Sequence, residues 1–230
     1  MRIAITALLV SAAATASAPA RPAARPPQDA ASVAIDKASA AYSRLKSARG
    51  TFEQTLTNPL TRNAATSRGE YQLQRASGRW SLVFTSPKGD KIVDDGSALW
   101  VYLPSTNPGQ VIKLSSQGAA GGASGMDLLD RFLGSPRTRY RVADAGAATV
   151  AGRGVRAVSL TPLQSMEFTK ATVWIDTANG TLRQFEVTEQ SGLVRRFTFT
   201  TVRLDAPVDE KALRFTPPKG VKVYDQSRAR

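Results

Sequence analysis

The spacing of apolar residues changes from a helical to an extended period near residue 50, and the extended period dominates the rest of the chain. Before that point, apolar residues recur three or four positions apart, which predicts an amphipathic helix of about four turns from Ser32, stopped by Gly50. After it, apolar and polar residues alternate, and turn signals recur about every 8–12 residues. The chain is therefore predicted to be mainly β (α+β), with regular short antiparallel strands.

The strand pattern is interrupted once, in the middle of the chain. Residues 117–125 are rich in Gly and predict a flexible loop, after which Ser124 is placed to cap a short helix over Met126–Leu133. Asn179-Gly180 lies between two later strand patterns and predicts a two-residue hairpin. Two amphipathic helices beside one long sheet need a surface to cover, so we expect a curved antiparallel sheet with a helical lid.

The first 31 residues differ in composition from the rest. Met1–Ala18 has one early positive charge, an apolar run too short to span a membrane, and an A-x-A ending, which together predict a secretory signal peptide. Residues 19–31 are rich in Pro and Ala and predict a flexible leader, which leaves 32–230 as one domain. No Cys follows the cleavage site, so lipid attachment there is not expected. These features predict an exported protein of the bacterial periplasm.

The chain contains no His and no Cys, and it has 31 Lys and Arg against 18 Asp and Glu. The two missing residue types exclude Ser-His and Cys-His nucleophiles, thiol redox chemistry, and zinc or copper sites. Catalysis would have to rest on carboxylates, Lys, Tyr or an all-oxygen metal site. Because the sequence offers no clear catalytic set of this kind, we expect a binding protein without metal or cofactor, not an enzyme. The net charge of +13 is spread along the chain without aromatic interleaving, which argues against nucleic acid. Solvated surface charge and attraction to an anionic membrane both remain open.

The acidic motifs favour turns over catalysis. Asp94 and Asp95 are adjacent, so in a strand their carboxylates would point to opposite faces, and Asp95-Gly96 has the composition of a hairpin turn. Asp176-Thr177-Ala178 leads directly into the predicted Asn-Gly turn. The glycine-rich segment lacks the Gly-Lys-Ser/Thr of a phosphate loop.

The segment Leu99–Leu103 is apolar on both faces, unlike most of the other predicted strands. Either the strand is buried on both sides, or one of its faces lines an apolar pocket. Which of its alternating side chains point inward is left open. Arg75 stands at the end of a strand, where it is either solvated or donates hydrogen bonds to carbonyl groups of the lid.

The chain resembles the LolA family of periplasmic outer-membrane lipoprotein carriers from about Ala34 to Gln226. The resemblance rests on the order and spacing of several motifs. They are Gly50-Thr51-Phe52-Glu53-Gln54, Gly69-Glu70, Arg75, Arg79-Trp80, the block from Pro87 to Pro104, Leu182-Arg183-Gln184-Phe185, Glu189-Gln190, Phe215–Val221 and Asp225-Gln226.

The resemblance implies an unclosed antiparallel barrel with a helical lid over a hydrophobic cavity that shields acyl chains. It implies that 32–230 is a lipoprotein-carrier domain that acts as a chaperone. Its expected partners are acylated lipoproteins as cargo, an inner-membrane lipoprotein-releasing ABC transporter and an outer-membrane lipoprotein acceptor, with the carrier itself a monomer. The candidate residues that line the cavity are Trp80, Leu82, Phe84, Leu99, Val101, Met126, Leu129 and Phe132.

The same resemblance makes Arg75 the candidate latch that bonds the lid backbone in the empty state. Ala76 follows it where the family often has Pro, so Arg79 is a second candidate for the latch. The Gly-rich loop and the basic charge also depart from better-known members. They leave two alternatives open, a lipid or glycolipid shuttle and a lipid-sensing regulatory domain on the same fold.

Overall fold

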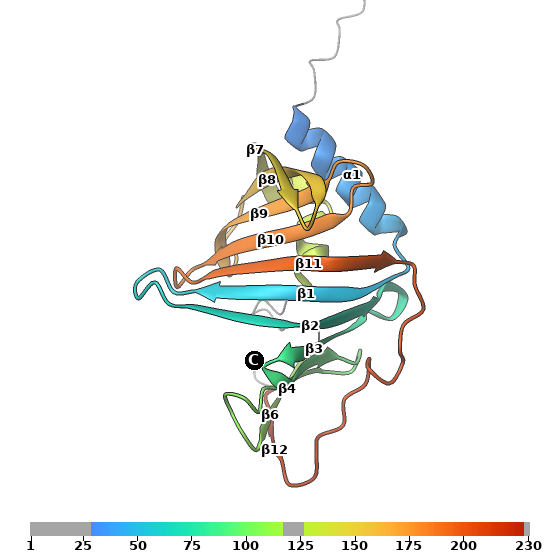
Figure 1. Cartoon of the computed structure of the whole chain (residues 1–230), viewed down its shortest axis with the longest axis vertical. Helices are drawn as coiled ribbons and strands as arrows, with labels where there is room; N and C mark the ends of the chain where they lie inside the picture. The colour runs from blue at the N-terminus through green and yellow to red at the C-terminus, as the bar shows by residue number, and fades with distance from the viewer. Residues whose placement is uncertain (1–28, 117–126, 228–230) are drawn as a thin grey trace, which may run out of the picture.

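The computed structural model describes residues 29–116 and 127–227, and one twelve-stranded sheet forms most of it (Figure 1). The strand order is β12-β6-β5-β4-β3-β2-β1-β11-β10-β9-β8-β7. Neighbouring strands are antiparallel, except that β12 runs parallel to β6. The strands are β1 (Ser47–Thr57), β2 (Ala64–Gln74), β3 (Arg79–Ser86), β4 (Lys88–Asp94), β5 (Leu99–Tyr102), β6 (Gln110–Leu114), β7 (Tyr140–Val150), β8 (Arg153–Pro162), β9 (Phe168–Asp176), β10 (Leu182–Glu189), β11 (Val194–Leu204) and β12 (Lys222–Asp225).

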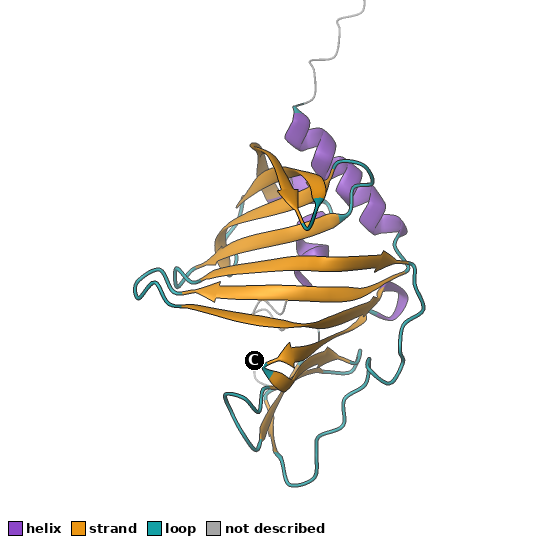
Figure 2. Cartoon of the chain, viewed as in Figure 1, coloured by secondary structure: helices purple, strands orange, loops and turns teal. Residues whose placement is uncertain are grey.

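The sheet is curved and open. Its two halves, β2–β6 and β7–β11, join where β1 pairs with β11 along ten residues of register, while β7 and β12 lie at opposite edges. The helices are α1 (Ala30–Arg44), α2 (Asp127–Leu133) and the short α3 (Pro136–Arg139), with a 3-10 turn, η1, at Arg75–Ser77. Figure 2 shows α1 running past one end of the sheet, and its contacts are with β7, β8, β9 and α2. The predicted mainly β fold, an unclosed curved sheet with few helices, is confirmed.

Helix α1 begins two residues earlier than expected and does not end at Gly50. Its first turn is capped by the Asp29 side chain, which accepts from the Ser32 amide at 2.6 Å. The helix ends at Arg44, and Gly50 lies inside β1. A Cβ atom on Gly50 would lie 2.0 Å from the carbonyl oxygen of Thr201, so this glycine permits a close approach of two strands next to a register shift.

The predicted turn at Asp95-Gly96 is present, whereas the Asn179-Gly180 hairpin is longer than expected. Gly96 has a φ of +86°, and the chain reverses there between β4 and β5. Between β9 and β10, the amide of Asp176 pairs with the carbonyl of Thr181, which makes a four-residue loop in place of a two-residue one. The Asp176 carboxylate accepts from the Ala178 amide at 3.0 Å and so starts the turn before the Asn-Gly pair is reached.

Strand β5 is apolar on both faces because each face has its own cover. Leu99 and Val101 belong to the main core, on the face that also carries Leu82. Trp100 and Tyr102 point to the outer face, where their rings lie 5.5 and 5.8 Å from the ring of Phe215. That phenylalanine belongs to the extended segment between β11 and β12, which crosses the outside of the sheet (Figure 1).

The core lies on the inner face of the sheet, the face that the helices cover. Its centre is a row of aromatic rings: Phe52 stacks on Phe197 at 4.8 Å, and Phe197 stacks on Phe185 at 5.2 Å. Phe84 meets Phe52 edge-on at 5.3 Å. In the part of the chain described, none of the helices is long and apolar enough to cross a membrane.

Candidate functional site

Helices α1 and α2, here called the lid, pack their side chains on the part of the inner face formed by β7–β10. Ile35 and Ala38 of α1 are fully buried, as their position on one stripe of an amphipathic helix requires. Phe132 of α2 is also fully buried, with ring centres 5.9 Å from Phe168 on β9 and 5.5 Å from Phe185 on β10. The lid therefore covers the apolar inner surface of strands β7–β10.

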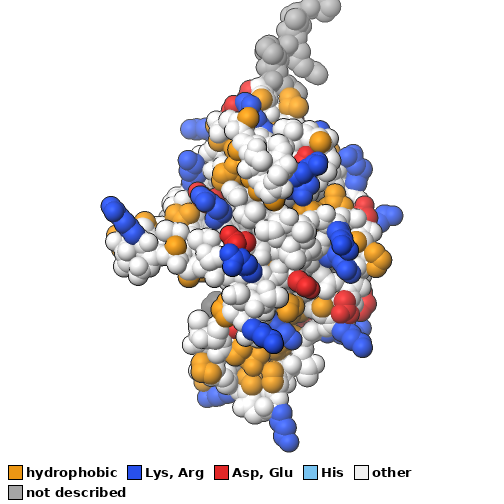
Figure 3. Space-filling view, viewed as in Figure 1, with side chains coloured by type: hydrophobic (Ala, Val, Ile, Leu, Met, Phe, Trp, Pro, Cys, Tyr) orange, Lys and Arg blue, Asp and Glu red, His pale blue; other side chains and the backbone are white. Residues whose placement is uncertain are grey.

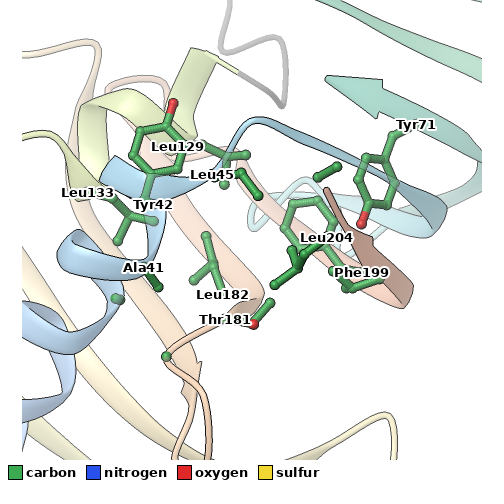
Figure 4. Close-up of a pocket in the computed structure, with 14 residues that line it drawn as sticks. Ala41, Tyr42, Leu45, Tyr71, Leu129, Leu133, Thr181, Leu182, Phe199 and Leu204 are labelled. Carbon is green, nitrogen blue, oxygen red and sulfur yellow. The ribbon is translucent and has the colours of Figure 1, made fainter. Parts of the chain in front are cut away.

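A small space lies between the described part of the lid and the sheet. This smaller cavity has a volume of about 60 Å³, far below the roughly 300–1,000 Å³ of typical ligand pockets. Figure 4 shows the residues that line it, among them Tyr42 of α1, Leu45 directly after that helix, Leu129 of α2 and Leu182 of β10. The walls are almost entirely apolar, so this space suits a hydrocarbon group. A long apolar ligand can enter only if the lid side chains move out.

Arg75 holds the C-terminal end of α1. It begins η1 directly after β2, where its amide donates to the Lys46 carbonyl, and its Nη1 donates to the Tyr42 carbonyl oxygen at 2.5 Å. The guanidinium also lies 4.3 Å from the centre of the Tyr42 ring. A cation is well placed there, because the last carbonyl groups of a helix carry partial negative charge. Burial raises the pKa of Tyr42 to about 12, so the phenol is neutral at physiological pH.

Arg79, the second candidate for this role, points away from the lid. It precedes Trp80 on β3, and because Trp80 points inward, Arg79 must point outward. There its guanidinium bonds to Gln74 and Ser77 and forms a 2.9 Å ion pair with Glu210. The expectation that Arg79 could replace Arg75 as the latch is therefore not supported by its position.

Further polar contacts hold the rest of the lid. Lys37 Nζ donates to the carbonyl groups of Thr177 and Ala178 in the β9–β10 loop, at 2.6 and 2.9 Å. The hydroxyl of Ser39 donates to the Leu133 carbonyl at 2.7 Å and so joins α1 to α2. These contacts, like that of Arg75, run from side chains to backbone carbonyl groups, and water can replace them when the lid moves.

A larger cavity lies toward the opposite end of the inner face, beside the β1–β2 hairpin. It has a volume of about 440 Å³, within the range of ligand pockets. Most of its wall is apolar, and polar groups stand at a few points. The residues that line it include Leu56, Phe84, Ile92, Val101, Leu103 and Leu114, together with Gln54, Asp90 and Arg195.

The candidate cavity residues occupy different places on this inner face. Phe84 and Val101 line the larger cavity, and Leu129 lines the smaller one. The remaining described candidates are buried in the core without lining either cavity: Trp80, Leu82, Leu99 and Phe132. Met126, together with the predicted Ser124 cap and the Gly-rich loop, lies outside the described residues. The open question of register is answered by Leu99 and Val101, which face inward.

Several residues of the site do not follow from the predicted motifs. The Tyr42 carbonyl and Lys37 contacts depend on how the helix docks, which local sequence does not encode. Arg195 and Gln54 did carry a signal, because each lies two residues from an inward phenylalanine in an alternating strand. Parity thus places a cation and an amide on an otherwise apolar face.

The adjacent carboxylates at residues 94 and 95 form a turn, as predicted. The Asp94 carboxylate accepts from the Gly96 amide, while Asp95 accepts from Ser97, Ala98 and the Trp100 indole. Burial raises the pKa of Asp94; it also opposes ionisation of Asp95, but the hydrogen bonds outweigh it and lower the pKa of that carboxyl. Among the described residues, no three His, Cys, Asp or Glu side chains are grouped to hold a metal ion.

The basic residues are distributed over the surface. Figure 3 shows Lys and Arg scattered over the visible face, with acidic side chains beside several of them. Ion pairs on the protein surface include that of Arg137 with Asp36, at 2.5 Å, and that of Arg68 with Glu53, at 2.8 Å. This face therefore lacks the continuous basic stripe typical of nucleic-acid binding.

Comparison with known proteins gives one consistent result. Residues 43–216 match the model of the family described as "Outer membrane lipoprotein carrier protein LolA". The outer-membrane lipoprotein carrier protein of Chromobacterium violaceum is 30% identical over 215 residues, which cover 94% of this chain and 95% of the relative. That of Proteus mirabilis is 29% identical over 184 residues, covering 80% and 84%. An uncharacterized conserved protein from Thermus thermophilus shares the fold with a TM-score of 0.50 and 12% identity, over 86% of this chain and all of that one.

Proposed function

Because this chain belongs to the LolA family of outer membrane lipoprotein carrier proteins, we propose that it binds the acyl chains of lipoproteins and carries them through the periplasm. The observation that carries the proposal is a lid whose apolar side chains cover the β7–β10 part of the inner face and which is held at Lys37, Ser39 and Arg75 by hydrogen bonds to backbone carbonyl groups. Acyl chains that replace those side chains would be kept from water by the same surface.

The free energy gained by burying a few CH₂ groups is similar in size to the free energy lost when the Arg75 hydrogen bond breaks. Each buried CH₂ group contributes about 0.8 kcal/mol, so a bare acyl chain is strongly disfavoured in water. A hydrogen bond to a charged group contributes about 1.5–3 kcal/mol, so the loss of the Arg75–Tyr42 contact is offset by burying about two to four CH₂ groups. Loading is then favourable, while closing of the lid helps to release the cargo.

The position in the cell and the partners follow from the same proposal. We place the mature chain in the periplasm, exported by Met1–Ala18, with 32–230 as the carrier domain and a monomer as its working form. Its cargo would be received from an inner-membrane ABC transporter and delivered to an outer-membrane acceptor lipoprotein. None of these steps needs a reactive side chain, which agrees with a chain that has no His and no Cys.

Native mass spectrometry of the protein purified from periplasm tests the proposal. The expected result is a complex with lipoproteins that carry acyl chains on their N-terminal cysteine, and no complex with the same lipoprotein when that cysteine is replaced by serine. Bound free lipid or glycolipid would indicate a lipid shuttle instead. An empty protein in complex with a signalling partner would indicate a lipid-sensing regulatory domain.

A further inference from the structure

A cation with a free donor stands at the wall of the larger cavity. Arg195 is on β11, directly opposite Leu56 of β1 and Val187 of β10, so its side chain belongs to the inner face. Its Nη1 donates to the Gln54 amide oxygen at 3.3 Å, and its Nη2 pairs with Glu189 at 3.1 Å. Its Nε–H is buried and has no hydrogen-bond partner among the described residues. A buried donor without an acceptor is costly and rare.

The surroundings of this donor define the acceptor that would suit it. Glu189 neutralises the charge of the guanidinium, so a second carboxylate or a phosphate would face an unfavourable negative neighbour. The 3.3 Å contact to Gln54 is long, so an acceptor in the cavity can compete with the Gln54 oxygen for the guanidinium. Most of the remaining wall is apolar, with Phe84, Val101 and Leu114 along it, and the Asp90 carboxylate that also lines it would likewise repel an anion. These conditions favour a neutral carbonyl oxygen at the end of a hydrocarbon chain.

We infer that Arg195 binds an ester carbonyl oxygen at the head of a cargo acyl chain, with the chain itself lying along the larger cavity. This inference rests on the proposed carrier function and adds a polar recognition point to it. Under this inference, the two ends of the inner face have different functions. The end near Arg75 controls the lid, and the end near Arg195 orients the lipid.

A pair of synthetic lipopeptides tests the inference. Both carry two C16 chains on an N-terminal cysteine through a glyceryl thioether, one with ester-linked chains and the other with ether-linked chains that lack the carbonyl oxygens. The wild-type protein should bind the ester form about tenfold more tightly, as expected for one hydrogen bond to a charged group. Arg195→Met should lose this preference and keep the affinity for the ether form.

Arg196→Met is the matched control, because Arg196 is exposed on the opposite face and pairs with Glu186 at 2.6 Å. It should keep the tenfold preference. Equal affinity of the wild-type protein for the two forms would overturn the inference, whether or not the variants fold, and so would a preference that survives in Arg195→Met. If the wild-type protein binds neither lipopeptide, the carrier function itself fails, and the subsite fails with it.

Discussion

The Nη1 atom of Arg75 lies 2.5 Å from the carbonyl oxygen of Tyr42, and the guanidinium of the same arginine packs on the Tyr42 ring. One side chain from the 3-10 turn after β2 thus binds both the backbone and the ring of one residue at the end of α1. The same carbonyl also accepts from the Leu45 amide at 3.2 Å, so the contact sits where the helix ends. Opening of the lid must break it.

Arg75→Leu should therefore shift the lid toward its open form. We expect the variant to load acylated lipoprotein normally but to transfer it to an outer-membrane acceptor about tenfold less efficiently, because closing no longer gains about 1.4 kcal/mol. The measurement is transfer of a loaded lipoprotein to acceptor-containing vesicles. Arg79→Leu is the matched control, since Arg79 points outward, and it should transfer at the wild-type rate. Undiminished transfer by Arg75→Leu would contradict the latch.

Lys37 should hold the first half of α1 in a similar way. Lys37→Met removes its two hydrogen bonds to the β9–β10 loop while keeping the aliphatic stem. Because exposed contacts of this kind are worth about 1 kcal/mol, amide hydrogen exchange in the first half of α1 should speed up about fivefold. Lys170→Met, at an exposed position on β9, is the control and should leave α1 unchanged. Equal exchange in both variants would show that Lys37 does not hold the helix.

Replacement of Gly50 by alanine should destabilise the protein far more than the same replacement of another glycine in a strand. Gly50→Ala places a Cβ 2.0 Å from the Thr201 carbonyl oxygen, so β1 and β11 must separate, and we expect a loss of about 2–4 kcal/mol in the free energy of unfolding. Gly154→Ala is the control, because its Cβ meets nothing closer than Thr177 Oγ1 at 3.8 Å. Urea denaturation measures both. A near-neutral Gly50→Ala would mean that the strands do not approach this closely.

Asp176 should make stability depend on acid pH. Burial raises the pKa of this carboxyl, but hydrogen bonds from Arg153, Ala178 and Arg183 outweigh burial and leave its pKa below the usual value. A lowered pKa in the folded state means that the stabilisation is complete above the unfolded pKa of about 3.9 and is lost as the pH falls through the folded value. Asp176→Asn should lose about 2 kcal/mol at pH 7 and much less at pH 2.5, measured by urea denaturation. An equal loss at both values would contradict this.

The strand content could be predicted because alternation is a local property. The segments around Phe52, Leu82 and Phe197 all form strands, and the Asp95-Gly96 turn lies where its composition indicates. The predicted helix end at Gly50 was wrong, because a glycine that follows a helical pattern resembles a helix end. Here the glycine instead allows β1 to approach Thr201 on β11, a strand near the other end of the chain. Contacts of that kind are invisible in a local pattern.

The inner face of β5 could not be predicted for the same reason. Trp100 and Tyr102 are large aromatic residues that suit a buried face as well as Leu99 and Val101 do. The packing of Phe215 on Trp100 and Tyr102 shows that this pair lies on the outer face. The presence of a smaller and a larger cavity on the inner face likewise depends on where α1 and α2 dock.

In the proposed loading step, acyl chains replace the lid side chains on the inner face, and amide hydrogen exchange in α1 reports this replacement. Exchange would be compared for the empty protein, for the protein with a diacylated lipopeptide, and for the protein with the same peptide without acyl chains. We predict that the diacylated lipopeptide, but not the peptide without acyl chains, speeds amide exchange about tenfold in α1 and at Leu45 directly after it. The amides of β1 and β11 should stay protected in all three samples. A lipopeptide that binds but leaves exchange in α1 unchanged or slower would contradict the proposed loading step.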